Sequence, residues 1–219
     1  MQKTKRLTIA IIFIILLSFG IAVYSYQKIE GDIVASHWDA KGNVNGYMSK
    51  FFGIFLFPFV SLGLYILFSL IPKIDPLKKN IKIFRKYYDL FVFIIILFLF
   101  YIFVLTILSN LNYNFNITTM LMPAMGILFF GIGMFMNKLK RNWFIGIRTP
   151  WTISNDIVWE KTHKLGSKIF KIIGVLFVIG LFFEKYLLWF VLAPVIISTI
   201  WLVLYSYLEH TKIKKIKKE

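Results

Sequence analysis

Two side chains with metal-binding chemistry stand one helical turn apart in the second half of the chain. Glu160 and His163 form a Glu-x-x-His pair, the spacing that helical di-metal carboxylate sites use. Such sites need a second pair and further carboxylates, which this sequence lacks. The alternative is structural, with His163 packed beside Trp159 and Glu160 paired with a nearby lysine. We therefore predict no metal and no cofactor, and the absence of cysteine also excludes thiolate sites and thiol nucleophiles.

The pair belongs to a polar segment, NWFIGIRTPWTISNDIVWEKTH, at residues 142–163. Pro150 disfavours helical backbone angles at the residue before it, so this part should be extended or turning. Ser154 or Asn155 can then cap a helix whose first turn carries Asp156. Beyond that point, lysines follow one side of the predicted helix and apolar residues follow the other. We expect an interfacial helix that bends into the next membrane-spanning helix.

The same segment holds three of the six tryptophans and an arginine. The tryptophans can belong to the aromatic belt of a membrane surface, or they can frame a shaped loop, since a belt does not require the glycine, arginine and proline between them. The guanidinium of Arg148 is a planar fork of donors. It could bind backbone carbonyls at helix ends, reach Glu160 or Asp156, or engage an acidic surface on a partner. The predicted site consists of Asn142, Trp143, Gly146, Arg148, Thr149, Pro150, Trp151, Trp159, Glu160 and His163.

A second polar stretch, HWDAKGNVNGYMSK, occupies residues 37–50. Its glycines and asparagines favour left-handed backbone angles, so the stretch could be a simple turn. Alternatively, its first three side chains could hydrogen-bond a ligand, and the sequence leaves both explanations open. The candidate residues of this stretch are His37, Trp38, Asp39, Gly42, Gly46 and Tyr47.

Composition identifies the elements that must carry these two stretches. Of the 219 residues, 58% are hydrophobic, 19% are aromatic and only 16% are charged, whereas soluble domains carry about 25% charge. A hydrocarbon core of about 30 Å needs roughly 20 apolar residues as a helix. Segments that meet this need are residues 7–26, 51–71, 90–108, 117–136, 169–183 and 187–208.

The predicted fold class is therefore an all-α polytopic membrane protein. It has six transmembrane helices, both termini in the cytoplasm and one amphipathic cytoplasmic helix before the fifth span. We expect two domains, an N-terminal two-helix unit at 1–72 with the His-Trp stretch and a four-helix unit at 73–219 with the Arg-Thr-Pro-Trp loop.

The distribution of basic residues predicts the orientation. If the N-terminus is inside, the only lysines or arginines outside, of 26 in all, are Lys28, Lys41, Lys50 and Lys185. Cytoplasmic loops collect lysine and arginine, so both termini should be cytoplasmic in a multi-pass protein of the cell membrane. This rule, together with anionic inner-leaflet lipids, explains the net charge of +16 without a nucleic-acid partner.

Prolines recur at similar depths in three of the predicted spans. Pro58, Pro123 and Pro194 each remove a backbone hydrogen bond and can kink a helix. They can be tolerated membrane prolines, or they can shape an outward-facing cavity for a peptide or lipid. The central stretches carry no ionisable group, which disfavours ion-coupled transport.

RNWFIGIRTPWTISNDIVWEKTHKLGSKIF, at residues 141–170, closely resembles the signature of the SdpI family of bacterial and archaeal membrane proteins. Residues 37–50 are similar to the domain of unknown function that often precedes it, although the prolines usual before the His-Trp pair are replaced by IEGDIVAS.

The resemblance implies a non-enzymatic role in immunity and signalling. The family's namesake protects a cell from a secreted killing peptide and holds a transcriptional repressor at the membrane. The expected partners are therefore membrane lipids, an antimicrobial peptide outside and a small repressor inside, without direct contact to nucleic acid. The alternative is a membrane-embedded enzyme or transporter for lipid or peptide that uses Glu160 and His163.

Overall fold

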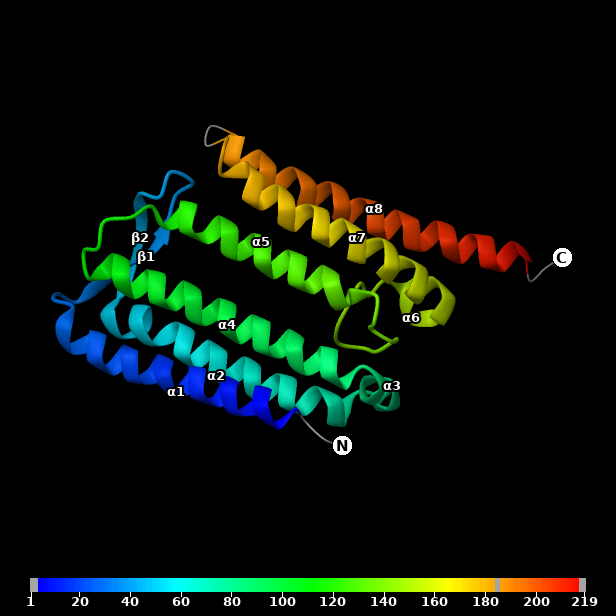
Figure 1. Cartoon of the computed structure of the whole chain (residues 1–219), viewed down its shortest axis with the longest axis horizontal. Helices are drawn as coiled ribbons and strands as arrows, with labels where there is room; N and C mark the ends of the chain where they lie inside the picture. Colours follow the sequence, from blue (N-terminus) through cyan, green and yellow to red (C-terminus); the bar gives the residue numbers. More distant parts are fainter. Residues whose placement is uncertain (1–3, 184–185, 217–219) are drawn as a thin grey trace. The chain divides into compact units, whose positions relative to one another are not determined.

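The computed structural model describes residues 4–183 and 186–216 (Figure 1). Lys185 and the chain ends, which enter the charge argument above, lie outside these residues. The described part is mainly helical, with one short antiparallel hairpin. Its elements are α1 (Lys5–Lys28), β1 (Ile33–Trp38), β2 (Val44–Ser49), α2 (Lys50–Ile74), α3 (Lys78–Ile83), α4 (Arg85–Asn110), α5 (Ile117–Met136), α6 (Pro150–Ser154), α7 (Asp156–Gly180) and α8 (Leu187–Ile216).

Five helices of the described part are long and apolar enough to cross a bilayer. They are α1, α2, α4, α5 and residues Trp189–Ile216 of α8, and they coincide with all the predicted spans except the fifth. The expectation of a helical, multi-pass membrane protein is confirmed. The count of six spans stays a prediction, because it depends on α7.

The predicted interfacial helix and the predicted fifth span form one uninterrupted helix, α7. Asn155 caps it by accepting hydrogen bonds from the N–H groups of Ile157 and Val158, and Asp156 lies in its first turn, as predicted. The helix ends at Gly180, so the expectation of helix at residues 181–183 is wrong. Lysines occupy its exposed side, and this charge keeps α7 outside the set of apolar helices.

The chain forms two compact units, and each is described by itself. One consists of Gln2–Ser69 with Asp89–Ala124, and the other of Leu70–Tyr88 with Met125–Glu219. The hairpin therefore belongs to the first unit and the Arg-Thr-Pro-Trp loop to the second. The predicted domain boundary after residue 72 stays a prediction.

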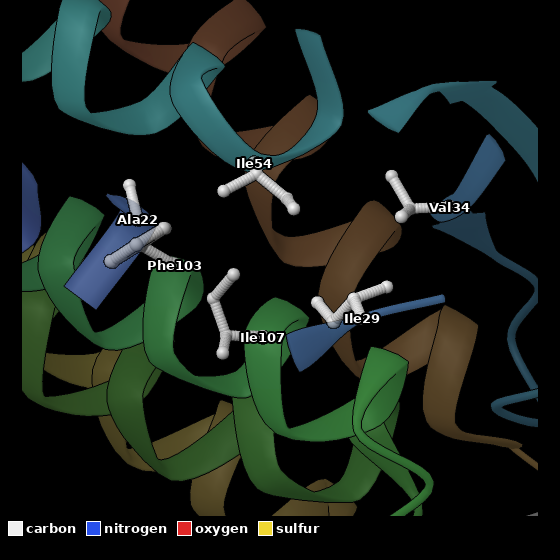
Figure 2. Close-up of a cluster of buried hydrophobic side chains, with 6 residues drawn as sticks. All are labelled: Ala22, Ile29, Val34, Ile54, Phe103 and Ile107. Carbon is white, nitrogen blue, oxygen red and sulfur yellow. The ribbon is translucent and has the colours of Figure 1, made fainter. Parts of the chain in front are cut away.

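The first unit has an apolar core where α1, β1, α2 and α4 meet. Figure 2 shows its buried side chains converging from these elements. Gly53 permits the close approach of α2 to the hairpin, because a Cβ there would collide with Val34. The core residues are Ala22, Ile29, Val34, Ile54, Phe103 and Ile107.

The hairpin itself was not predicted. β1 and β2 pair antiparallel, and the register is irregular near His37. The strands are six residues each, and their sequences lack the long period-two alternation that distinguishes a strand from a turn. The spans are helical, as the predicted all-α class requires, but the described part of the chain also contains this two-stranded sheet.

In the second unit, α7 packs closely against α5 and α8. A Cβ on Gly174 would lie 2.6 Å from the carbonyl oxygen of Gly126 on α5. A polar contact also joins α7 to α5: the hydroxyl of Ser167 donates to the carbonyl of Gly133 at 2.6 Å. On the other side, Lys161 pairs with the buried Glu209 of α8 at 2.7 Å. Small residues allow the helix backbones to touch, as in other membrane helix pairs.

Candidate functional site

The motif loop, residues 137–155, is built around the buried carboxamide of Asn142. Its Oδ1 accepts hydrogen bonds from the N–H groups of Phe144 at 3.0 Å and Ile145 at 2.7 Å. Its Nδ2 donates to the carbonyls of Lys140 and Ile145, each at 3.0 Å. The amide uses both of its N–H donors and its acceptor oxygen in these bonds. Asn142 therefore shapes the loop.

Gly146 lies where the loop passes over the ring of His163. Its φ is +117°, a backbone region that residues with a side chain rarely adopt. A Cβ at this position would also collide with His163 Nε2. Both the conformation and the close approach therefore require glycine here.

His163 is 1% exposed and hydrogen-bonds the backbone through both ring nitrogens. The N–H of Ile147 donates to Nε2 at 3.0 Å, so Nε2 carries the lone pair. Nδ1 therefore carries the hydrogen and donates it to the carbonyl of Trp159 at 2.8 Å. Burial lowers the pKa of His163 to about 4, so the ring is neutral near pH 7. With both nitrogens occupied, the ring offers neither a metal ligand nor a proton shuttle.

Trp159 stacks on His163, with ring centroids 4.0 Å apart. Its side chain is buried, and its Nε1–H donates to the carbonyl of Leu139 at 2.8 Å. Glu160 faces solvent and pairs with Lys140 at 3.4 Å. The structural explanation of the Glu-x-x-His pair is confirmed, since His163 packs against Trp159 and Glu160 pairs with a lysine.

Thr149 and Pro150 start the short helix α6. Pro150 occupies its first turn, and Thr149 and Thr152 form a reciprocal capping box. The hydroxyl of Thr149 also bonds to Ser206 of α8 at 2.9 Å. Trp151 packs edge-to-face on Tyr207 of α8, with ring centroids 5.1 Å apart. These contacts fasten α6 to α8.

Arg148 is exposed and is held by the loop itself. Its Nη1 donates to the carbonyl of Trp143 at 2.7 Å. The N–H of Trp143 in turn donates to the buried carboxylate of Asp75 at 2.9 Å. Of the contacts expected for Arg148, a backbone carbonyl is observed, although it belongs to the loop and not to a helix end.

The acidic residues that Arg148 was expected to reach have other partners. Asp156 pairs with Arg141 at 2.8 Å, and Glu160 pairs with Lys140. Both ion pairs border a polar pocket of about 200 Å³. Ion pairs this exposed contribute only about 0–1 kcal/mol each. The pocket is lined by Asn80, Ile83, Leu139, Lys140, Arg141, Asp156, Trp159 and Glu160.

The three tryptophans of the segment differ in exposure. Trp159 is 2% exposed, Trp151 is half-buried and Trp143 is 48% exposed. A belt residue would face the membrane surface, which the buried and hydrogen-bonded Trp159 does not. Trp159 is part of the buried support of the loop. The side chain of Trp143, whose backbone carbonyl accepts a hydrogen bond from Arg148, is exposed.

The residues of the second stretch build the turn of the hairpin. The carboxylate of Asp39 accepts hydrogen bonds from the N–H groups of Lys41 at 2.8 Å and Asn43 at 2.9 Å. Bonds from Asn43 are the main reason that the pKa of Asp39 lies below its usual value. Gly42 has a φ of +85°, as a tight turn requires. The turn explanation thus describes Asp39 and Gly42.

The other residues of that stretch line the hairpin. His37 hydrogen-bonds Asn45, and Gly46 leaves room for it, since a Cβ there would lie 2.8 Å from His37 Cβ. Trp38 is half-buried, and Tyr47 is 62% exposed. Tyr47 thus offers an accessible aromatic side chain at the hairpin.

The three prolines lie inside α2, α5 and α8. Pro194 lines an apolar pocket of about 210 Å³ between α7 and α8. Pro58 and Pro123 belong to the other compact unit. A shared cavity therefore stays a prediction.

Several residues that hold these sites were missed. Asp75 and Asn80 bind the motif loop through Trp143 and Arg141, and Asn110 binds the hairpin through Ala35. The available signal was that Asp75 and Asn110 are polar residues just beyond predicted apolar spans. Nothing local indicated which distant segment each would contact.

Comparison with known proteins bears on both stretches. Residues 138–206, which include most of the motif loop, match the model of the SdpI/YfhL protein family. Residues 13–62, which include the hairpin, match a domain of unknown function (DUF1648).

One curated relative spans nearly the whole chain. It is the immunity protein SdpI of Bacillus subtilis (strain 168), 27% identical over 205 residues, which cover 92% of this chain and 95% of the relative. No solved structure matches the chain. The expected family resemblance is confirmed.

Proposed function

From the similarity of the chain to the SdpI/YfhL family and to the immunity protein SdpI, we propose that it is an immunity protein of the cell membrane that protects its cell from a secreted antimicrobial peptide. The support is the collinear similarity to a relative that is itself named an immunity protein. We further propose that both termini and the motif loop are cytoplasmic, as the distribution of lysine and arginine favours.

A signalling role is supported by the contrast between the buried and the exposed residues of the motif loop. Asn142, Thr149, Trp159 and His163 are buried and bind the backbone or α8. Trp143 and Arg148 are exposed on the frame that the others build. A rigid aromatic and a guanidinium are residue types that dominate binding surfaces. In the proposal, this pair contacts a small cytoplasmic repressor and keeps it at the membrane.

An enzymatic or transport role has weaker support. It would use Glu160 and His163, but His163 is buried and its nitrogens bind Ile147 and Trp159. Glu160 points to solvent and is paired with Lys140. These two groups do not converge on one reacting atom, so we propose a non-enzymatic protein.

Survival tests the proposal. In one experiment, the chain is expressed in Bacillus subtilis (strain 168) cells that lack their own immunity protein SdpI. In a second experiment, the gene for the chain is deleted from the organism that makes it. Both sets of cells are grown with peptide-secreting siblings. Protection in the first case, or killing in the second, supports immunity. If the chain neither protects the first cells nor is needed by the second, the proposal is wrong.

A further inference from the structure

The sheet in the hairpin has one occupied edge and one open edge. In the described residues it consists of β1 and β2 alone. The far edge of β1 is occupied by Asn110, whose Oδ1 accepts from the N–H of Ala35 at 2.7 Å and whose Nδ2 donates to its carbonyl at 3.0 Å. The side-chain amide thus takes the place that a neighbouring strand would fill.

This contact determines where the backbone of β2 points. Because the N–H and C=O of Ala35 face away from β2, Ala35 and its partner Tyr47 form a non-hydrogen-bonded pair. The N–H and C=O of Tyr47 must then face away from β1 as well. The N–H of Lys50 bonds to the carbonyl of Asp32 at 2.8 Å, which fixes the same alternation one residue beyond Ser49. The N–H of Ser49 therefore also faces outward.

These outward groups have no partner in the described part of the chain, and the residues that carry them are exposed. Among residues 4–183 and 186–216, none hydrogen-bonds the N–H or C=O of Tyr47 or the N–H of Ser49. No residue of β2 is buried. Natural edge strands are commonly protected by lysine, proline or a covering element, but VNGYMS has neither residue.

The edge is held in place by contacts at its base and its turn. Val34 and Met48 pack on the apolar core of the unit. At the turn, Asn116 donates to the carbonyl of Lys41 at 2.7 Å, and Thr118 donates to that of Asp39 at 3.0 Å. A strand held at both ends is preorganised to bind, which lowers the entropy cost of binding.

We infer that the open edge of β2 binds the secreted peptide as an added strand. The outward groups of Tyr47 and Ser49 match the repeat of an extended main chain. Since β2 carries no charged side chain, the edge suits an uncharged stretch of that peptide, beside which the ring of Tyr47 can pack. This inference rests on the proposed function for the identity of the occupant, but the binding mode is testable without it.

The test uses the full chain in lipid nanodiscs and a labelled probe, the acetylated and amidated hexapeptide of alternating threonine and valine. Binding is followed by fluorescence anisotropy and by hydrogen exchange of the backbone amides. The probe should bind and slow exchange at Tyr47 and Ser49. Tyr47→Pro removes one outward N–H and should weaken binding about fivefold, since a lost hydrogen bond is worth about 1 kcal/mol. Tyr47→Phe keeps that N–H and should bind like the wild type.

Controls separate loss of the edge from loss of the fold. The amide of Met48, which pairs toward Val34, should stay protected in Tyr47→Pro if the hairpin is intact. A fully N-methylated probe should not bind. The inference is overturned if the wild type does not bind the hexapeptide at millimolar concentration, or if Tyr47→Pro binds it normally with Met48 protected. Because no toxin or host is present, failure of immunity in cells would overturn the proposed function and not this result.

Discussion

Acid should destabilise the compact unit that holds the motif loop, and the buried side chain of His163 should account for a defined part of this effect. Its usual pKa of 6.5 is lowered to about 4 by burial in the folded protein. Between these values, the unfolded chain binds a proton that the folded chain rejects. The free energy of unfolding should therefore fall as pH drops from 6.5 to 4, and it should be constant in this respect above and below that window.

The size of the effect follows from the gap between the two pKa values. Each pKa unit corresponds to about 1.4 kcal/mol, so a change from 6.5 to about 4 corresponds to about 3 kcal/mol. Protonation would also break a hydrogen bond, because a proton on Nε2 would replace the lone pair that accepts from the N–H of Ile147. At roughly 2–4 °C per kcal/mol for a chain of this size, the melting temperature should fall by about 10 °C.

His163→Gln isolates this contribution. The glutamine oxygen can accept from the N–H of Ile147 but cannot titrate, so the variant should lose about 3 kcal/mol less than the wild type between pH 6.5 and 4. Carboxylates titrate in both proteins and cancel in the difference. Thermal unfolding in detergent across this range gives the comparison, with His37→Gln in the exposed hairpin as the matched control. Parallel pH profiles for the wild type and His163→Gln would refute the assignment of a neutral, buried imidazole.

Three further predictions concern the exposed Arg148, the close contact between α7 and α5, and the orientation of the chain in the membrane. Arg148→Lys should impair signalling or immunity nearly as much as Arg148→Ala, with normal membrane insertion, because lysine keeps the charge and loses the planar fork; if the lysine variant behaves like the wild type while the alanine variant fails, Arg148 is only a headgroup charge. Gly174→Ala should cost about 1–3 kcal/mol in thermal unfolding, since its Cβ would lie 2.6 Å from a carbonyl on α5, whereas Gly20→Ala, with open space around it, should cost nothing. In this chain without cysteine, an impermeant maleimide should label Lys41→Cys in intact cells but label Ser154→Cys only after permeabilisation, and the reverse pattern would invert the topology.

The spans were predictable because they depend on composition alone. An apolar run of sufficient length must form a helix in lipid, where each backbone N–H and C=O needs an internal partner. Local motifs were predictable for a similar reason: Asn155 caps the residues directly after it, and Trp159 meets His163 because residues four apart share a helix face. In each case the interacting groups are neighbours in sequence.

The remaining features depend on contacts between distant residues. Asp75 binds the N–H of Trp143 across 68 positions, and Asn110 binds Ala35 across 75. No local pattern encodes such a pairing. The hairpin was missed for the same reason, since Asn110 completes its edge and the core residues below it come from three helices. The pairing of Arg141 with Asp156 likewise removed a partner that proximity in sequence had suggested for Arg148.

The polar character of the motif loop follows largely from its backbone. Between α5 and α6 the chain lacks regular structure, so its buried N–H and C=O groups need partners from side chains. Asn142, His163 and Asp75 supply them, and each is at most 1% exposed. Replacing any of these residues should damage the loop itself and reveal little about its role. Trp143 and Arg148 are different, because their exposed side chains are not needed to satisfy a buried backbone group. The chemistry that the loop offers to a partner is therefore concentrated in these two residues.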